Sequence, residues 1–109
     1  MIFGGTGFLG KVLVDFLLDD NANILLFVRN FHNRKDLQKY KSNSQIKIIN
    51  WNLSDTNIIQ ENMKHVDVVI NLCGILYENK RGDFDKVHSD LPSILGELCK
   101  QNKVNNFIR

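Results

Sequence analysis

The residues that could do chemistry gather near the start of the chain, in the run Gly4-Gly5-Thr6-Gly7-Phe8-Leu9-Gly10. Apolar residues precede this run and apolar residues at helical spacing follow it, which indicates a turn between a strand and a helix. The free backbone N–H groups and the positive dipole end of such a helix favour an anion. Gly4 permits the tight turn, Gly7 lets the backbone approach a pyrophosphate, and Gly10 lets the helix pack close to the strand. The run therefore predicts dinucleotide binding, with a glycine-rich tight turn as the alternative. The residues expected at the dinucleotide are Gly4, Thr6, Gly7, Phe8, Leu9 and Gly10.

A second candidate is Arg29, which directly follows the apolar run 24–28. Domains that select NAD place a carboxylate at the end of the second strand, about 20 residues past the glycines, to bind the ribose 2′-hydroxyl. This chain has Arg29-Asn30 there instead, with Arg34 and Lys35 close behind. Because a guanidinium attracts a 2′-phosphate, we expect NADP(H) to be favoured over NAD(H). The alternative is that Arg29 is a solvated strand-end residue.

The elements that must position these residues alternate between short apolar strands and amphipathic helices. Strands are expected at 1–3, 24–28, 46–49, 66–72 and 104–108. Helices are expected from residue 8 onward, over roughly 34–40, from 55 towards 63, and over 84–98 with a kink or a new start near Pro92. In the first helix the apolar spacing predicts a buried face made of Leu9, Val12, Leu13, Phe16 and Leu17. Five strands joined by helical crossovers predict an α/β fold of the Rossmann type, a truncated, doubly wound parallel sheet in the order 3-2-1-4-5.

Composition and charge argue against a nucleic-acid partner, a transmembrane segment and a metal site. The 109 residues suffice for one domain, and 14 basic against 12 acidic residues give a net charge of +2, too small to indicate a nucleic-acid partner. Six basic residues fall between 29 and 47 without an aromatic platform, so we interpret them as ordinary solvated surface. No stretch approaches the roughly 18 apolar residues of a transmembrane segment. Cys73 and Cys99 share no ligand spacing with the three histidines, which predicts reduced thiols in a cytoplasmic protein and no metal site.

The spacing of Gly4, Gly7 and Gly10 resembles that of the extended and atypical short-chain dehydrogenase/reductase families. More narrowly, the glycine run, the segment 71–78 (Asn-Leu-Cys-Gly-Ile-Leu-Tyr-Glu) and the segment 84–88 resemble one branch of these families. That branch comprises the bacterial relatives of the nucleotide-binding accessory subunit of respiratory complex I, described as NAD-dependent epimerase/dehydratase-like proteins. The resemblance covers nearly the whole chain. Its glycine motif is shared across a superfamily, whereas the Gly-Ile-Leu-Tyr-Glu segment is more specific.

The resemblance implies further contacts with the cofactor. Asn52-Leu53 matches an Asp-Leu pair beside the adenine, and here an amide stands where the family has a carboxylate. Leu72-Cys73-Gly74 matches the turn that lines the adenosine ribose and the pyrophosphate. Within that turn we expect Cys73 to act as a small buried side chain.

The resemblance also implies that residues 1–109 form one NAD(P)-binding domain that is incomplete at both ends, because the family begins earlier and continues to a catalytic Tyr-x-x-x-Lys. Neither Tyr40 nor Tyr77 is followed by a lysine four positions later, so no catalytic residue is expected in this chain.

The expected function is therefore an NAD(P)(H)-binding module of a complex I accessory-subunit-like protein, with a structural nucleotide and no catalysis by this chain alone. Its implied partners, besides the dinucleotide, are respiratory complex I subunits at the membrane surface, and its implied location is cytoplasmic or peripheral on the inner face of the membrane. Two alternatives stay open. The chain could be part of an active NADP-dependent reductase or epimerase whose catalytic segment lies elsewhere, or it could be a non-functional gene remnant.

Overall fold

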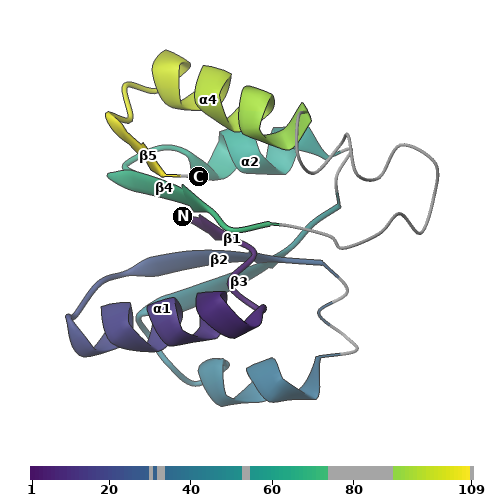
Figure 1. Cartoon of the computed structure of the whole chain (residues 1–109), viewed down its shortest axis with the longest axis vertical. Coiled ribbons are helices and arrows are strands. Elements are labelled where there is room, and N and C mark those ends of the chain that lie inside the picture. The colour runs from purple at the N-terminus through teal and green to yellow at the C-terminus, as the bar shows by residue number, and fades with distance from the viewer. Residues whose placement is uncertain (30, 32–33, 53–54, 74–89, 109) are drawn as a thin grey trace.

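In the computed structural model, five parallel strands form one sheet in the order β3-β2-β1-β4-β5 (Figure 1). The structure describes residues 1–29, 31, 34–52, 55–73 and 90–108. The strands are β1 (Ile2–Phe3), β2 (Ile24–Val28), β3 (Ile46–Asn50), β4 (Val68–Asn71) and β5 (Asn106–Ile108). The predicted strand order and the Rossmann-type α/β fold are thus confirmed.

Helices cover both faces of this sheet (Figure 1). One face carries α1 (Phe8–Asp19) and the 3₁₀ helix η2 (Lys35–Tyr40), and the other carries α2 (Thr56–Asn62) and α4 (Leu91–Gln101). Successive side chains of a strand point to opposite faces of the sheet, so each strand contributes residues to two hydrophobic cores, one on each face. Ile2 and Leu26 pack under α1 and η2, while Phe3 and Phe27 pack under α2 and α4.

The short central strand β1 pairs with a neighbour on each side. Ile2 is in register with Leu26 of β2 and Ile70 of β4. The carboxyl ends of the four strands β1 to β4 therefore lie along one edge of the sheet, and the segments that leave these strands meet there. That edge is where an open parallel sheet binds its ligand.

The buried face of α1 differs from the one predicted by the apolar spacing. Leu9, Val12 and Phe16 were expected inside, yet they are 66%, 57% and 67% exposed, and the buried residues of the helix are Gly10 and Val14. A Cβ at Gly10 would lie 2.4 Å from the carbonyl oxygen of Gly4, so Gly10 faces the sheet at very close range. This contact fixes the rotation of α1 and turns much of the apolar stripe outward. Leu13 and Leu17, also expected in that stripe, are half-buried.

The strands predicted at 66–72 and 104–108 start later in the structure. The backbone N–H of the first predicted residue of each donates a hydrogen bond within the preceding turn, so it is not available to the sheet. The N–H of Val66 donates to Met63 O over 3.2 Å, and β4 starts only at residue 68. The N–H of Val104 donates to Cys99 O over 2.8 Å, and β5 starts at residue 106.

The last helix, α4, starts at Leu91 with Pro92 in its first turn. The missing N–H of proline costs little there, since the first amides of a helix have no helical acceptor. The earlier part of the predicted helix, residues 84–89, lies outside the described residues.

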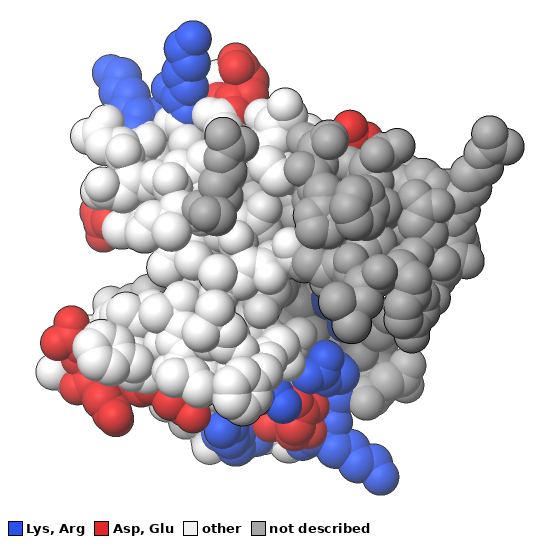
Figure 2. All heavy atoms as spheres, viewed as in Figure 1, with Lys and Arg blue, Asp and Glu red and all other residues white. Residues whose placement is uncertain are grey.

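The basic cluster between residues 29 and 47 is partly neutralised by acidic neighbours. Lys39 Nζ lies 3.8 Å from Asp15 Oδ2, and Arg34 Nη2 lies 2.9 Å from Asp36 Oδ2. Figure 2 shows acidic and basic side chains next to one another on the part of the surface where α1 and η2 lie. This mixed charge agrees with the interpretation of the cluster as solvated surface.

Candidate functional site

The glycine turn after β1 packs directly on the segment that leaves β4. Gly4 has a φ of +79°, a conformation that side chains disfavour. A Cβ at Gly4 would lie 2.5 Å from the carbonyl carbon of Leu72 and 2.6 Å from the amide nitrogen of Cys73. Only glycine fits at this position, so the two segments predicted to border the ligand do meet.

Gly7 leaves open space in front of the first turn of α1. It is the N-cap residue, and among the described residues a Cβ there would meet only Gly4 O, at an ordinary 3.8 Å. The first helical hydrogen bond runs from the Lys11 N–H to Gly7 O over 2.9 Å. The amides of residues 8–10 lie before that bond and have no acceptor within the helix, so they are available to an anion.

A cavity of about 390 Å³ opens beside this turn, at the carboxyl ends of the strands. Its lining residues are Gly4, Thr6, Gly7, Phe27, Val28, Arg29, Arg34, Trp51, Leu72 and Cys73. Six of the predicted site residues are therefore brought together: Gly4, Thr6, Gly7, Arg29, Leu72 and Cys73.

The remaining predicted site residues are placed differently. The side chains of Phe8 and Leu9 are 89% and 66% exposed and do not line the cavity, so any contact with a ligand there would come from their backbone. Gly10 packs on the backbone of Gly4 and Gly5, and its lack of a side chain lets α1 lie close to the turn. Asn52 does not line the cavity. Its carbonyl oxygen accepts a hydrogen bond from the Asp55 N–H over 3.1 Å. Leu53 and Gly74 lie outside the described residues.

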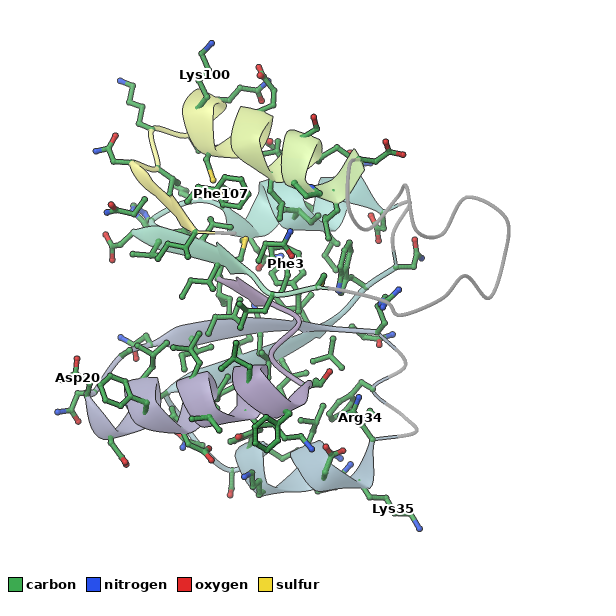
Figure 3. The ribbon with its side chains drawn as sticks, in the orientation of Figure 1. Phe3, Asp20, Arg34, Lys35, Lys100 and Phe107 are labelled. Carbon is green, nitrogen blue, oxygen red and sulfur yellow. The ribbon has the colours of Figure 1, made fainter. Side chains whose placement is uncertain are left out.

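Arg34 ties the loop after β2 to the glycine turn. Its Nη2 donates to the carbonyl oxygen of Thr6 over 3.1 Å and to Asp36 Oδ2 over 2.9 Å, and its Nε donates to Asp36 Oδ1 over 3.1 Å. Figure 3 shows Arg34 beyond the N-terminal end of α1. Lys11 Nζ lies 2.6 Å from the same carboxylate. The two cations hold the pKa of the Asp36 carboxyl well below its usual range, so the carboxylate stays charged.

Arg29 and Cys73 lie close enough to interact electrostatically across the cavity. Burial raises the pKa of the Cys73 thiol to about 11, although the positive charge of Arg29 acts in the opposite direction. Burial therefore favours the neutral thiol, which is a much weaker nucleophile than the thiolate. Its backbone is held by the buried Asn71, whose Oδ1 accepts from the Cys73 N–H over 3.1 Å.

Three aromatic rings support the cavity from the core. Phe3 and Phe27 stack with ring centroids 4.6 Å apart, and Trp51 meets Phe3 edge-on at 5.1 Å. Trp51 is only 5% exposed, yet it borders the cavity. Sequence analysis missed Phe27, Val28 and Trp51 as lining residues. The sequence could have indicated them, because they lie at or directly after the carboxyl ends of the strands β2 and β3, where a ligand is expected.

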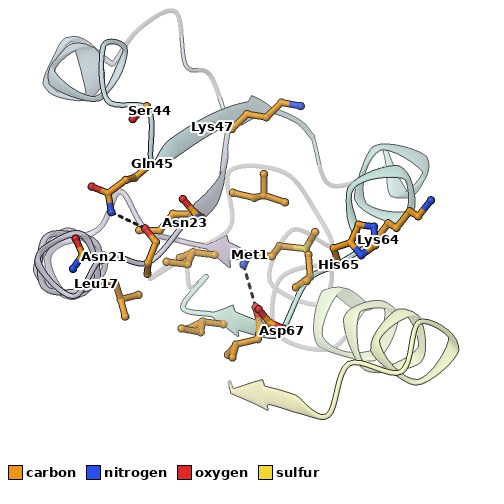
Figure 4. Close-up of a pocket in the computed structure, with 17 residues that line it drawn as sticks. Met1, Leu17, Asn21, Asn23, Ser44, Gln45, Lys47, Lys64, His65 and Asp67 are labelled. Carbon is orange, nitrogen blue, oxygen red and sulfur yellow. Dashed lines mark hydrogen bonds between the residues drawn. The ribbon is translucent and has the colours of Figure 1, made fainter.

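A larger cavity, of about 680 Å³, lies at the opposite edge of the sheet, among the amino ends of the strands (Figure 4). There the Met1 ammonium donates a hydrogen bond to Val68 O over 3.0 Å. Burial lowers the pKa of this ammonium, and Asp67 opposes that shift. Among the described residues, neither a helix N-terminus nor a glycine turn borders this cavity, so these residues do not provide the features that suit a phosphate.

Among the residues that the structure describes, no helix is long and apolar enough to cross a membrane. No three His, Cys, Asp or Glu side chains among the same residues could together hold a metal ion.

Comparison with protein families gives one match and several relatives. Residues 1–86 match the family described as the NmrA-like family. The mitochondrial 40 kDa subunit of NADH-ubiquinone oxidoreductase from Neurospora crassa is 30% identical over 107 residues. Subunit 9 of the mitochondrial NADH dehydrogenase [ubiquinone] 1 alpha subcomplex from Rattus norvegicus is 29% identical over 108 residues. Each alignment covers 98% of this chain but only 28% and 29% of the respective relatives, so the chain spans less than a third of their length.

Solved structures similar to this chain share its fold at low sequence identity. Pen from Bacillus thuringiensis superposes with a TM-score of 0.84 at 18% identity, over 97% of this chain and 36% of that protein. The Bordetella bronchiseptica enzyme WbmH, solved in complex with NAD+, gives a TM-score of 0.77 at 15% identity, over the same shares. These likenesses independently support the Rossmann-type arrangement of strands and helices.

Proposed function

The chain belongs to the NmrA-like family, and from this membership and the geometry of its glycine turn we propose that it is an NAD(P)(H)-binding module. One observation carries the proposal. The cavity at the carboxyl edge of the sheet is bordered by Gly4 and Gly7, where the first turn of α1 presents its free amides. That arrangement suits a pyrophosphate and has little other use in a strand-to-helix turn.

Different residues of the turn make different contacts with the dinucleotide in this proposal. The amides of residues 8–10 donate to the pyrophosphate, and Gly7 gives it room, since nothing but Gly4 O lies within reach of a Cβ there. We propose, from the family resemblance, that Leu72-Cys73-Gly74 contacts the adenosine ribose and the pyrophosphate and that Asn52-Leu53 contacts the adenine; Leu53 and Gly74 lie outside the described residues. The chain's own residues bind and orient the nucleotide in this proposal, and hydride chemistry at the nicotinamide ring would be used only in the second candidate function, that of a reductase or epimerase.

The proposed preference for NADP(H) rests on Arg29. This exposed arginine directly follows β2 and lines the cavity, where NAD-selective domains have a carboxylate. Arg34 is less suited to the 2′-phosphate because its fork already holds Asp36 and Thr6 O. The 2′-phosphate would therefore meet the guanidinium of Arg29 in a charge-assisted contact.

The wider role we propose is that of a complex I accessory-subunit-like protein whose nucleotide is structural. Support comes from two relatives that align along 98% of this chain. The one in Neurospora crassa is named as a subunit of NADH-ubiquinone oxidoreductase, and the one in Rattus norvegicus as a subunit of NADH dehydrogenase. The module itself is proposed to be catalytically silent and to lie in the cytoplasm or on the inner face of the membrane beside complex I subunits. The second candidate, part of an NADP-dependent reductase or epimerase, is favoured by the enzymes among the structural neighbours.

Amide chemical-shift mapping tests the binding proposal at the level of single residues. Adding NADPH to the ¹⁵N-labelled chain should move the backbone signals of residues 4–10, Arg29 and residues 72–73. The signals of residues 64–68, at the opposite edge of the sheet, should stay in place and serve as the internal control. Shifts confined to that opposite edge, or no shifts at saturating NADPH, would refute the proposed site.

The partner proposal needs its own experiment. Membranes from cells that make the tagged chain are solubilised gently and separated on a native gel. The tag should migrate with the NADH dehydrogenase activity of complex I, and it should leave the membranes in high salt without detergent, as a peripheral protein does. Migration only at the size of the free chain would contradict complex I association while leaving nucleotide binding untouched.

A further inference from the structure

Trp51 has a buried side chain whose one polar atom has no partner among the described residues. The residue is 5% exposed, and its backbone N–H donates to Val28 O over 3.0 Å, which extends the pairing of β2 and β3 by one residue. Its indole N–H makes no hydrogen bond with any residue that the structure describes. A buried indole N–H usually has an acceptor, so this donor is available to a ligand.

The open space beside this donor is the cavity at the carboxyl edge of the sheet. Across the described residues, every side-chain nitrogen or oxygen that is fully buried has a hydrogen-bond partner. The indole nitrogen of Trp51 has none, so it must retain some accessible surface. Trp51 lines the cavity that Gly7 and Arg29 also line. The donor therefore reaches the space in which the dinucleotide is proposed to bind.

Two phenylalanine rings hold the indole in a fixed orientation. The plane of the indole lies at 81° to the ring of Phe3 and at 76° to the ring of Phe27, with ring centroids 5.1 Å and 6.1 Å apart. Both phenylalanines are almost completely buried, at 0% and 2% exposed. A donor that is fixed before the ligand arrives loses little conformational freedom on binding, so its hydrogen bond can contribute to affinity.

The order of the strand ends indicates which part of a dinucleotide reaches Trp51. Gly4 follows β1, Arg29 follows β2 and Trp51 follows β3, and these three strands are neighbours in that order. Adjacent strands lie roughly 4.8 Å apart, so the backbone of Trp51 is about 10 Å from the glycine turn. With the pyrophosphate at the glycine turn and the 2′-phosphate at Arg29, the adenosine half extends towards β3. The base, which lies beyond the ribose, then reaches Trp51.

We propose that Trp51 binds the adenine, and that its indole N–H donates a hydrogen bond to a ring nitrogen of that base. Adenine offers ring nitrogens that accept hydrogen bonds, whereas a purely apolar ligand would leave the indole donor unpaired. This contact rests on the proposed function, because it requires the dinucleotide to occupy the cavity with its adenosine half towards Arg29. It adds a side-chain contact that fixes the position of the base.

The indole signal in a ¹⁵N spectrum of the wild type tests this contact without any mutation. The chain has one tryptophan, so one indole N–H signal reports on Trp51. Saturating adenosine 2′,5′-bisphosphate should move this signal downfield, as a new hydrogen bond does, and should also move the amide signals of residues 8–10. Nicotinamide mononucleotide is the matched ligand: it carries a ribose and a phosphate but no adenine, and it should leave the indole signal in place.

Trp51→Phe removes the donor and keeps an aromatic ring. By calorimetry it should weaken the binding of adenosine 2′,5′-bisphosphate and of NADPH by the same factor, about three- to tenfold. Phe107→Leu is the matched control variant. Phe107 packs against the same hydrophobic core but is not among the described residues that line the cavity, so its replacement should leave both affinities unchanged.

Three results would overturn the contact between Trp51 and the adenine while leaving the dinucleotide site in place. They are an indole signal that stays in place while the amides of residues 8–10 shift, an equal indole shift with nicotinamide mononucleotide, and unchanged affinities in a folded Trp51→Phe variant. A wild type whose spectrum does not respond to NADPH at all would refute the proposed function and this contact together. If Trp51→Phe does not fold, the wild-type spectra still give the answer.

Discussion

The guanidinium of Arg34 donates a hydrogen bond to the carbonyl oxygen of Thr6 over 3.1 Å, across 28 positions of sequence. The same guanidinium makes a bidentate contact with the Asp36 carboxylate, and Lys11 of α1 forms a salt bridge with that carboxylate. The loop after β2, the glycine turn and the first helix are therefore linked by one chain of polar contacts. We infer that the shape of the turn depends on this link.

Arg34→Lys is expected to weaken the binding of NADH and NADPH by similar factors, about three- to tenfold. Lysine keeps the charge but cannot bind Asp36 and Thr6 O at once, because it lacks the planar fork. Isothermal calorimetry with both nucleotides measures the effect. Lys35→Ala, which removes the neighbouring exposed cation, is the matched control and should change neither affinity. A loss restricted to NADPH would instead make Arg34 the residue that binds the 2′-phosphate.

The wild-type chain is expected to bind NADPH about ten- to a hundredfold more tightly than NADH. A hydrogen bond to a charged group contributes roughly 1.5–3 kcal/mol, and about 1.4 kcal/mol corresponds to tenfold in affinity. Arg29→Asp should abolish or invert this preference, because a carboxylate repels the 2′-phosphate and accepts from a 2′-hydroxyl. Fluorescence titration of the wild type and of Arg29→Asp with NADPH and with NADH measures the affinities. Equal affinities of the wild type for the two nucleotides would rule the assignment of Arg29 out.

The Met1 ammonium is expected to make the 109-residue chain more stable as the pH rises towards its ordinary pKa of 8.0. Burial lowers the pKa of the Met1 ammonium below its value of 8.0 in the unfolded chain. Between these two pKa values the unfolded state binds more protons than the folded state, so raising the pH favours folding. Urea unfolding at several pH values measures the slope. The N-terminally acetylated chain carries every other titrating group, and it should lose this part of the slope; an identical slope in both proteins would contradict the assignment.

Gly10→Ala and Gly7→Ala form a matched pair that tests whether the close approach at Gly10 limits the packing of α1. A Cβ at Gly10 would sit 2.4 Å from Gly4 O and 2.6 Å from the Cα of Gly5, so α1 must move, at a cost of about 1–3 kcal/mol. At Gly7 the nearest atom is 3.8 Å away and φ is −75°, so alanine should change the free energy of unfolding by less than about 1 kcal/mol. Urea unfolding of the two variants compares these values. Equal destabilisation of both would show that the close approach at Gly10 does not limit packing.

The sequence was enough to predict the parallel sheet and its strand order, because alternating apolar runs and a glycine turn leave few topologies open. It also located most of the cavity lining, since Arg29 and Leu72 follow strands whose ends must meet. Apolar spacing alone predicted the wrong rotation of α1, because the close contact between Gly10 and the backbone of Gly4 decides it. The predicted role of Gly10 in close packing was the available signal. The contact between Arg34 and Thr6 O likewise joins segments that no local pattern relates.

Calorimetric titration with NADPH of the wild type and of Gly7→Asp tests most directly whether the glycine turn holds a dinucleotide. Aspartate is a favoured N-cap residue, so the variant should fold at least as stably as the wild type, while its carboxylate repels the pyrophosphate. We expect the wild type to bind one NADPH per chain, and Gly7→Asp to bind at least about thirtyfold more weakly. A folded wild type that gives no saturable heat, or equal affinity in the two proteins, would contradict a dinucleotide site at the glycine turn.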